Sequence, residues 1–270
     1  MRAGICLTAL FNVNLSMKIS IITVCYNSAE TIGATLQSVR EQTHPDIEHI
    51  VIDGGSGDTT LEVISVEGSN VAKVVSEPDH GIYDAMNKGL LIASGDVVGF
   101  LNSDDVLAHP TVISRIAETM ANPSTDACHG DLVYVAQRDL SKVVRYWKSR
   151  EYRPGQFERG WVPAHPTFYA RRALYQRYGG FDLKFGLAAD FDILLRLFES
   201  CGIRSKYIPE VLVKMRLGGA TNASLRNVFQ QNMEIANAFR KYGLRPGLKL
   251  FAFRLITRIS QFVRKPSAHV

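Results

Sequence analysis

The first hundred residues alternate between short apolar runs and segments with apolar residues at helical spacing. Four runs rich in β-branched residues predict strands, at residues 19–24, 47–53, 71–76 and 96–101. Three segments between them have the helical period, at residues 32–39, 59–66 and 82–93. Strands and helices that alternate in this way are typical of βαβ units. The pattern therefore predicts an α/β fold with a mostly parallel sheet.

Polar residues follow each of the four predicted strands. They are Tyr26 and Asn27 after the first, Asp53 at the end of the second, Glu77, Asp79 and His80 after the third, and Asp104 and Asp105 after the fourth. Each could serve only to cap a helix or form a turn. In an open α/β sheet, however, ligands bind beyond the carboxyl ends of the strands. Four polar groups at that one edge indicate a ligand site.

The adjacent carboxylates of Asp104 and Asp105 suggest what the ligand contains. Two like charges raise each other's proton affinity unless a cation or polar ligand lies against them. The glycine-rich turn at 54–57 lacks the lysine of a P-loop, and no G-x-G-x-x-G follows the first strand. Carboxylates that hold a divalent ion on phosphate oxygens are the usual alternative. We therefore expect a nucleotide diphosphate with a divalent ion.

The composition fits one domain with appendages. The chain has 270 residues, of which 46% are hydrophobic, enough for one sizeable core. Its four cysteines form no C-x-x-C pair, which argues against structural zinc and a disulfide framework and favours a reducing cytosol. No apolar run is long enough to predict a spanning helix. Residues 1–16 resemble a signal peptide only weakly, and we interpret them as a loose N-terminal extension.

Three blocks of the sequence resemble family 2 glycosyltransferases of the GT-A fold. They are SIITVCYNSAETIGATLQSVREQTHPDIEHIVIDGGSGDTT, EPDHGIYDAMNKGLLIASGDVVGFLNSDD and GGFDLKFGLAADFDILLRL, in that order. The resemblance covers about residues 17–220. It implies a Rossmann-like sheet flanked by helices, and transfer of a sugar, with inversion, from a nucleotide-diphosphate sugar to an acceptor hydroxyl.

The resemblance also implies roles for individual residues. It places Tyr26 beside the nucleotide base, Asp53 near the base or ribose, and Asp104 at the ribose. Asp105 would ligate a Mg²⁺ or Mn²⁺ ion on the diphosphate. By the same resemblance, residues 17–106 form the nucleotide-sugar-binding half of the catalytic domain.

Three positions depart from the family's usual pattern. Gly54 stands where a second Asp is common after the second strand, which leaves the nucleotide base open. Asn102 stands where an Asp often opens the acidic motif. Ala189 stands where a Glu often precedes Asp190, so Asp190 is the remaining carboxylate of a usual pair.

Asp190 is our candidate for the general base. Direct displacement needs a group that takes the acceptor proton, and the family places it in this block. The alternative is that Asp190 only caps the apolar helix that follows. Asp192, two residues on, would point elsewhere on that helix.

The acceptor half is predicted to span residues 107–220. His165 and Arg216 could line its acceptor or diphosphate side. An isolated histidine is more often a structural residue, and ordinary loop chemistry explains the segment around Arg216 nearly as well.

The last segment, residues 221–270, is predicted to be a basic helical tail. Eight Lys and Arg residues and no acidic residue follow Glu234, and without them the chain would hold 23 basic and 26 acidic residues. Basic residues share one face of a predicted helix, and apolar residues such as Leu255, Ile259 and Phe262 occupy the other. Such a helix suits an anionic membrane surface. Docking on the domain or on a second subunit is the alternative. No recognition motif for nucleic acid accompanies it.

Together these features predict a metal-dependent, inverting glycosyltransferase, of the hexosyltransferase class, with a lipid-linked or polysaccharide acceptor. We expect it in the cytoplasm, peripheral on the inner face of the cell membrane. A sugar nucleotidyltransferase would share the sheet and the acidic pair, but no glycine-rich loop with a basic residue follows the first strand. A non-enzymatic nucleotide-sugar-binding protein on the same fold would tolerate loss of Asp190.

Overall fold

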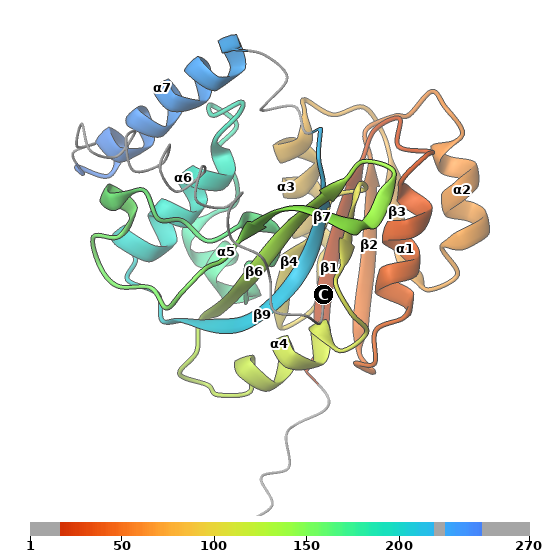
Figure 1. Cartoon of the computed structure of the whole chain (residues 1–270), viewed down its shortest axis with the longest axis horizontal. Coiled ribbons are helices and arrows are strands. Elements are labelled where there is room, and N and C mark those ends of the chain that lie inside the picture. The colour runs from red at the N-terminus through yellow and green to blue at the C-terminus, as the bar shows by residue number, and fades with distance from the viewer. Residues whose placement is uncertain (1–16, 219–224, 245–270) are drawn as a thin grey trace, which may run out of the picture.

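The structure, a computed structural model, describes residues 17–218 and 225–244, whose strands form one nine-stranded sheet (Figure 1). Four parallel strands confirm the prediction: β1 (Ile19–Cys25), β2 (Ile47–Asp53), β3 (Val71–Ser76) and β4 (Val97–Phe100). They lie in the order β3-β2-β1-β4. The three predicted crossover helices are α1 (Ile32–Arg40), α2 (Thr60–Glu67) and α3 (Ile82–Ile92). The α/β fold class is therefore confirmed.

Beyond β4 the strand directions are mixed. The sheet continues with β8 (Tyr169–Arg171), β6 (Ala127–Ala136), β9 (Ser205–Arg216) and β5 (Asp105–Leu107), and β7 (Asp139–Trp147) forms a hairpin with β6. Among the described strands beyond β4, only β6 and β9 pair in parallel. The short strand β5 begins at Asp105, so Asp104 ends the loop between β4 and β5 and Asp105 is already part of the sheet.

The remaining helices belong to the second half of the chain. They are α4 (Val112–Met120), α5 (Arg172–Tyr178), α6 (Ala189–Leu195), which continues as the π-helical turn η3 (Arg196–Ser200), and α7 (Leu225–Lys241), with 3₁₀ turns η1 (Phe157–Arg159) and η2 (His165–Thr167). No helix among the described residues is both long and apolar enough to cross a bilayer.

The alternation of side chains along the strands packs apolar residues on both faces of the sheet. Ile22 and Val24 of β1 pack in the cluster that contains Met86 of α3. Cys25, on the opposite face of the same strand, packs with Leu36 of α1. Successive residues of a strand point to opposite faces, so a sheet whose runs are apolar throughout is covered on both sides.

Helix α7 opens the segment that the sequence assigns to the tail, and it is packed on α6. The rings of Phe191 and Phe239 lie 5.7 Å apart. Lys241 Nζ lies 3.0 Å from the buried carboxylate of Asp192 and 2.9 Å from that of Asp182. Thus Asp192 points away from Asp190, as predicted, and one of the eight tail cations is neutralised within the domain. The basic helix predicted beyond residue 244 and the extension 1–16 lie outside the described residues.

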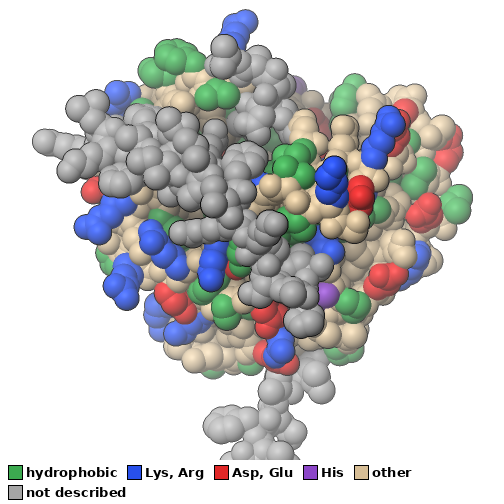
Figure 2. Space-filling model, in the orientation of Figure 1, with side chains coloured by type: hydrophobic (Ala, Val, Ile, Leu, Met, Phe, Trp, Pro, Cys, Tyr) green, Lys and Arg blue, Asp and Glu red, His purple; other side chains and the backbone are tan. Residues whose placement is uncertain are grey.

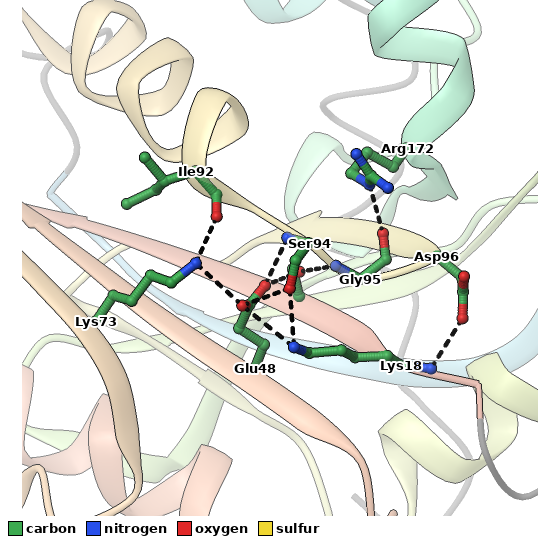
Figure 3. A network of polar contacts seen from close by, with 9 residues as sticks. Lys18, Glu48, Lys73, Ile92, Ser94, Gly95, Asp96 and Arg172 are labelled. Carbon is green, nitrogen blue, oxygen red and sulfur yellow. Dashed lines mark hydrogen bonds and ion pairs between the residues drawn. The ribbon is translucent and has the colours of Figure 1, made fainter.

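The amino ends of the parallel strands are joined by a network around Glu48 (Figure 3). Its Oε1 lies 3.3 Å from Nζ of both Lys18 and Lys73. Its Oε2 accepts hydrogen bonds from Ser20 Oγ at 2.6 Å and from the N–H of Ser94 at 2.7 Å. Burial alone would raise the pKa of Glu48, but these hydrogen bonds outweigh it and bring the pKa from 4.5 to about 2.

Glu48→Gln is expected to lower the free energy of unfolding at pH 7 by roughly 2–3 kcal/mol, because each pKa unit corresponds to about 1.4 kcal/mol. The pKa is lower in the folded state, so the carboxylate stabilises the fold above about pH 4.5 and this contribution is lost as the pH falls towards 2. Urea unfolding at pH 7 and pH 3 measures both effects. Glu151→Gln, at an exposed position, is the control. Equal stability of wild type and Glu48→Gln at pH 7 would show that the network is not stabilising.

Candidate active site at the carboxyl edge of the sheet

Asp53 ends β2 and fixes the loop that follows it. Its Oδ2 accepts hydrogen bonds from the N–H groups of Gly55 and Ser56, at 3.1 and 3.0 Å, and from Ser76 Oγ at 2.7 Å. Burial alone would raise the pKa of Asp53, but hydrogen bonds from Ser56 and Ser76 hold the pKa below its usual value. The side chain is fully buried, so it holds the loop through these hydrogen bonds from the protein interior. Its predicted contact with the base or ribose stays a prediction.

The loops after three of the parallel strands, β1, β2 and β4, are joined to one another. Asn27, after β1, accepts a hydrogen bond from the N–H of Gly57 at 2.9 Å, and its own N–H donates to Ser56 Oγ at 2.8 Å. Ser28 Oγ lies 2.8 Å from Ser103 Oγ in the loop after β4. The polar residues that the sequence places after β1, β2 and β4 therefore form one continuous edge.

Tyr26 presents its ring at this edge. The side chain is 64% exposed, although β1 directly before it is buried. Its neighbour Asn27 has a φ of 50°, a left-handed conformation that Asn tolerates better than most residues and that turns the chain sharply out of the strand. An exposed ring on a fixed turn can stack on a nucleotide base.

Gly54 has a local reason to be glycine. A Cβ atom there would lie 2.5 Å from Asp79 Oδ2, in the loop after β3. Asp79 is itself held by the N–H of Gly81, which donates to Oδ1 at 2.8 Å. The carboxylate expected on residue 54 from the family pattern is absent, and a carboxylate from the next loop lies against that position.

The two carboxylates of the acidic pair have different surroundings. Asp105 is fully buried, whereas Asp104 is partly exposed. Asn102 Nδ2 donates to Asp105 Oδ2 at 3.1 Å, but the buried Oδ1 atoms of both residues have no hydrogen-bond partner among the described residues. Burial, and then the charge of Asp104, raise the pKa of Asp105 well above its usual value. Among the described residues, the surroundings of Asp105 therefore offer little positive charge and few hydrogen-bond donors.

Arg216 supplies a positive charge that acts on the pair. Arg216 is the last residue of β9, and the residue before it, Met215, pairs with Asp105 of β5. Burial raises the pKa of Asp104, and the positive charge of Arg216 acts to lower it. The same charge also acts to lower the pKa of Asp105. Its Nη1 donates to the carbonyl of Gln137 at 2.7 Å, and no salt bridge to either carboxylate forms among the described residues. Its predicted contact with the acceptor or the diphosphate stays a prediction.

No three His, Cys, Asp or Glu side chains within residues 17–218 and 225–244 cluster closely enough to hold a metal ion. A divalent ion at this edge would therefore take most of its ligands from phosphate oxygens and water. Mg²⁺ is commonly bound in that way, through one or two carboxylates and the substrate. The partly exposed carboxylate of Asp104 fits such an ion.

Asp190 is held at the start of α6 by a residue far away in the sequence. Tyr83 Oη donates to Asp190 Oδ1 at 3.1 Å, and the N–H of Phe191 donates to the same atom at 2.8 Å. The N-cap of α6 is Ala188, so the alternative in which Asp190 is the N-cap is wrong. Asp190 does accept from one N–H of the first turn, and it is partly exposed. It is therefore an oriented carboxylate that can accept a proton.

His165 lies in an aromatic cluster near Asp190. Its ring centre is 5.4 Å from that of Phe100, at the end of β4, and 5.4 Å from that of Phe181. Burial lowers the pKa of His165, and the charge of Asp190 acts in the opposite direction. A neutral, buried imidazole agrees with the structural alternative, and its predicted place on the acceptor or diphosphate side stays a prediction.

Tyr83 is the residue that sequence reasoning missed. In the sequence of α3, Tyr83 looks like one more apolar position of the helix, and no residue near it in the sequence indicates a contact with Asp190. Its ring centre lies 5.5 Å from that of Phe181, and its hydroxyl reaches Asp190 in the first turn of α6. Only the folded chain brings these residues together.

Comparison with known proteins identifies the family. Residues 20–179 match the family described as Glycosyl transferase family 2. An uncharacterized glycosyltransferase of Mycobacterium tuberculosis is 35% identical over 186 residues, which is 68% of this chain and 70% of the relative. A PGL/p-HBAD biosynthesis glycosyltransferase of Mycobacterium bovis is 28% identical over 222 residues, 80% of this chain and 84% of the relative. The chain therefore belongs to glycosyltransferase family 2.

Solved structures support the same fold. Residues 1–349 of TarS from S. aureus, in complex with UDP-GlcNAc, have a TM-score of 0.65 and 19% identity. The likeness covers 90% of this chain and 73% of that chain. The curled, mostly parallel sheet is thus a GT-A fold. The predicted family and fold are confirmed, and the protein is a glycosyltransferase.

Tyr83→Phe is expected to lower kcat for glycosyl transfer by roughly 3–10-fold with little change in the donor KM. The substitution keeps the ring and removes one hydrogen bond to Asp190, worth on the order of 1 kcal/mol. Tyr152→Phe is a matched control, because its hydroxyl donates to the Phe198 carbonyl instead. Steady-state kinetics that show equal kcat values for wild type and Tyr83→Phe would exclude this positioning role.

Proposed function

We propose that the protein moves a sugar from a nucleotide-diphosphate sugar to an acceptor hydroxyl, with inversion at the anomeric carbon. The observation that carries the proposal lies at the carboxyl edge, where the buried Oδ1 atoms of Asn102 and Asp105 have no hydrogen-bond partner among the described residues. A diphosphate with its cation would supply the missing charge and ligands. The oriented carboxylate of Asp190 supplies the second requirement, a proton acceptor.

The donor is proposed to bind along the edge formed by the loops after β1, β2 and β4. The exposed ring of Tyr26 would stack on the base, and the loop that Asp53 holds would receive the base and ribose. Structures of similar fold are described in complex with UDP, UDP-GlcNAc and GDP-Man. We favour a uridine nucleotide, because the TarS structures have the highest TM-scores among these.

The metal ligand is proposed to be Asp104 rather than Asp105. Asp105 is fully buried and bonded to Asn102, whereas Asp104 is partly exposed at the same edge. A glucosyl-3-phosphoglycerate synthase of similar fold is described with Mn²⁺ and UDP. A bound Mg²⁺ or Mn²⁺ would neutralise charge on the departing diphosphate. Arg216 would add a fixed positive charge on the same side.

The transfer step is proposed to be a single displacement. Asp190 would accept the proton of the acceptor hydroxyl as the oxygen attacks the anomeric carbon, and the nucleoside diphosphate would leave from the opposite face. Tyr83 would hold Oδ1 of Asp190 in place for this transfer.

A lipid-linked or polysaccharide acceptor is our proposal for the second substrate. Relatives are named for PGL/p-HBAD biosynthesis and as a chondroitin synthase of Pasteurella multocida, which is 29% identical over 219 residues. Six Lys and Arg residues follow Leu244 in the sequence, with no Asp or Glu. Such a segment would attract the enzyme to an anionic membrane surface, on the inner face of the cell membrane.

Asp190→Asn is expected to lower transfer by on the order of a hundredfold or more, while donor binding stays nearly unchanged, because only proton acceptance is lost. Product formation measured by mass spectrometry and donor affinity measured by calorimetry separate the two effects. Retained transfer together with a lowered Tm would assign Asp190 to the stability of α6 instead.

Asp104→Asn is expected to abolish the increase in UDP affinity that Mn²⁺ causes, because the accessible carboxylate is lost. Asp105→Asn should retain most of that increase, since its side chain is buried among protein atoms. Calorimetric titration of UDP with and without Mn²⁺ compares the two variants. The opposite ranking would return the ligand role to Asp105.

Removal of residues 245–270 is expected to reduce flotation with vesicles that contain phosphatidylglycerol, and added salt should weaken flotation of the full chain through screening. The chain is cut after Leu244 because Lys241 and Tyr242 both contact Asp192. If the shortened chain floats as well as the full one, this segment is not the anchor.

A further inference from the structure

Helix α7 carries an outward stripe of unusual composition. The exposed residues that the structure describes on this stripe are Arg226, Phe229, Gln230, Met233, Asn237 and Arg240. Their spacing of three and four residues places them along one side of the helix. Phe229 is 68% exposed and Met233 is 45% exposed. Figure 2 shows hydrophobic side chains at this upper edge of the molecule, over α7.

The opposite side of α7 is fixed, so the stripe cannot turn inward. Ile235 and Phe239 are fully buried, and Lys241 pairs with the buried Asp192 at the end of the helix. Phe229 and Met233 stay at the surface because the other face of α7 already fills the core. The stripe is therefore a permanent feature of this surface.

The same helix holds the loop that leads to Asp190. Glu234 Oε2 accepts a hydrogen bond from the N–H of Leu187 at 2.8 Å. Gln231 Nε2 donates to the carbonyl of Leu187 at 3.4 Å. Leu187 lies three residues before Asp190, so these hydrogen bonds connect α7 to the loop that precedes the proposed base.

We propose that the outward stripe of α7 docks on an anionic bilayer surface. Its two apolar side chains are flanked by Arg226 and Arg240, and none of its exposed side chains is acidic. Apolar residues flanked by cations are the chemistry that binds the interface of an anionic membrane. The inference rests on the proposed function, since a lipid-linked acceptor would then reach Asp190 from the membrane side.

The position of α7 along the chain supports this occupant. The described residues end at Leu244, three residues after the helix, and the sequence continues with six Lys and Arg residues and no acid. The stripe and this basic segment are thus adjacent in the chain. A second copy of the protein would instead meet like charges at Arg226 and Arg240.

The test is vesicle sedimentation of the full chain carrying Phe229→Gln and Met233→Gln, with phosphatidylcholine vesicles that contain or lack phosphatidylglycerol. We expect roughly tenfold weaker partitioning onto the anionic vesicles, from the apolar area no longer buried. The matched control is Val66→Gln with Leu91→Gln, which removes two apolar residues that are 81% and 85% exposed on α2 and α3. This control should partition as the wild type does.

Two results would overturn the proposal. One is equal partitioning of the wild type and the α7 variant, and the other is a concentration-dependent dimer of the wild type that the variant abolishes. Transfer to a soluble acceptor sugar without vesicles should be the same in both proteins. If the α7 variant partitions more weakly but neither protein transfers sugar, the proposed function is wrong while the proposed membrane docking of α7 is supported.

Discussion

Uncompensated negative charge at one end of a parallel sheet is the constraint on which this structure depends. Strands β1, β2 and β4 run in the same direction, so their carboxyl ends meet and bring Asp53, Asp104 and Asp105 to one edge. Asp53 is satisfied by the loop that it holds. Asp105 is not, since burial and its neighbour Asp104 oppose its ionisation. We propose that a ligand that carries a cation completes this site.

The two ends of the same sheet make the contrast clear. At the amino end, the buried carboxylate of Glu48 has two lysines and several donors, and its pKa falls to about 2. At the carboxyl end, the buried carboxylate of Asp105 accepts a side-chain hydrogen bond from Asn102 but forms no ion pair among the described residues, and its pKa rises. The first arrangement stabilises the fold, and the second is where we propose that the substrate binds. Helix α6 then adds Asp190, and α7 holds the loop before it.

The sequence predicted those parts of the fold and the site that depend on local pattern. The four parallel strands follow from apolar runs, and the acidic edge follows from the residues after them. The contact between Tyr83 and Asp190 joins residues 107 positions apart, and no local signal reports it. The different burial of Asp104 and Asp105 depends on β5 and β9, which pair from distant parts of the chain. The ion pair of Lys241 with Asp192 could not be predicted either, because a basic residue within a basic segment is expected to be a solvent-exposed charge.

The central claim is that nucleotide diphosphate and cation complete the acidic edge beside Asp104. The most direct measurement is the anomalous scattering of Mn²⁺ in crystals grown with UDP. The account predicts a Mn²⁺ peak within about 2.5 Å of an Asp104 carboxylate oxygen, a usual distance for oxygen ligands of divalent ions, with the uracil ring against Tyr26. A nucleotide bound away from this edge, or a Mn²⁺ ion that contacts neither Asp104 nor the diphosphate, would contradict it.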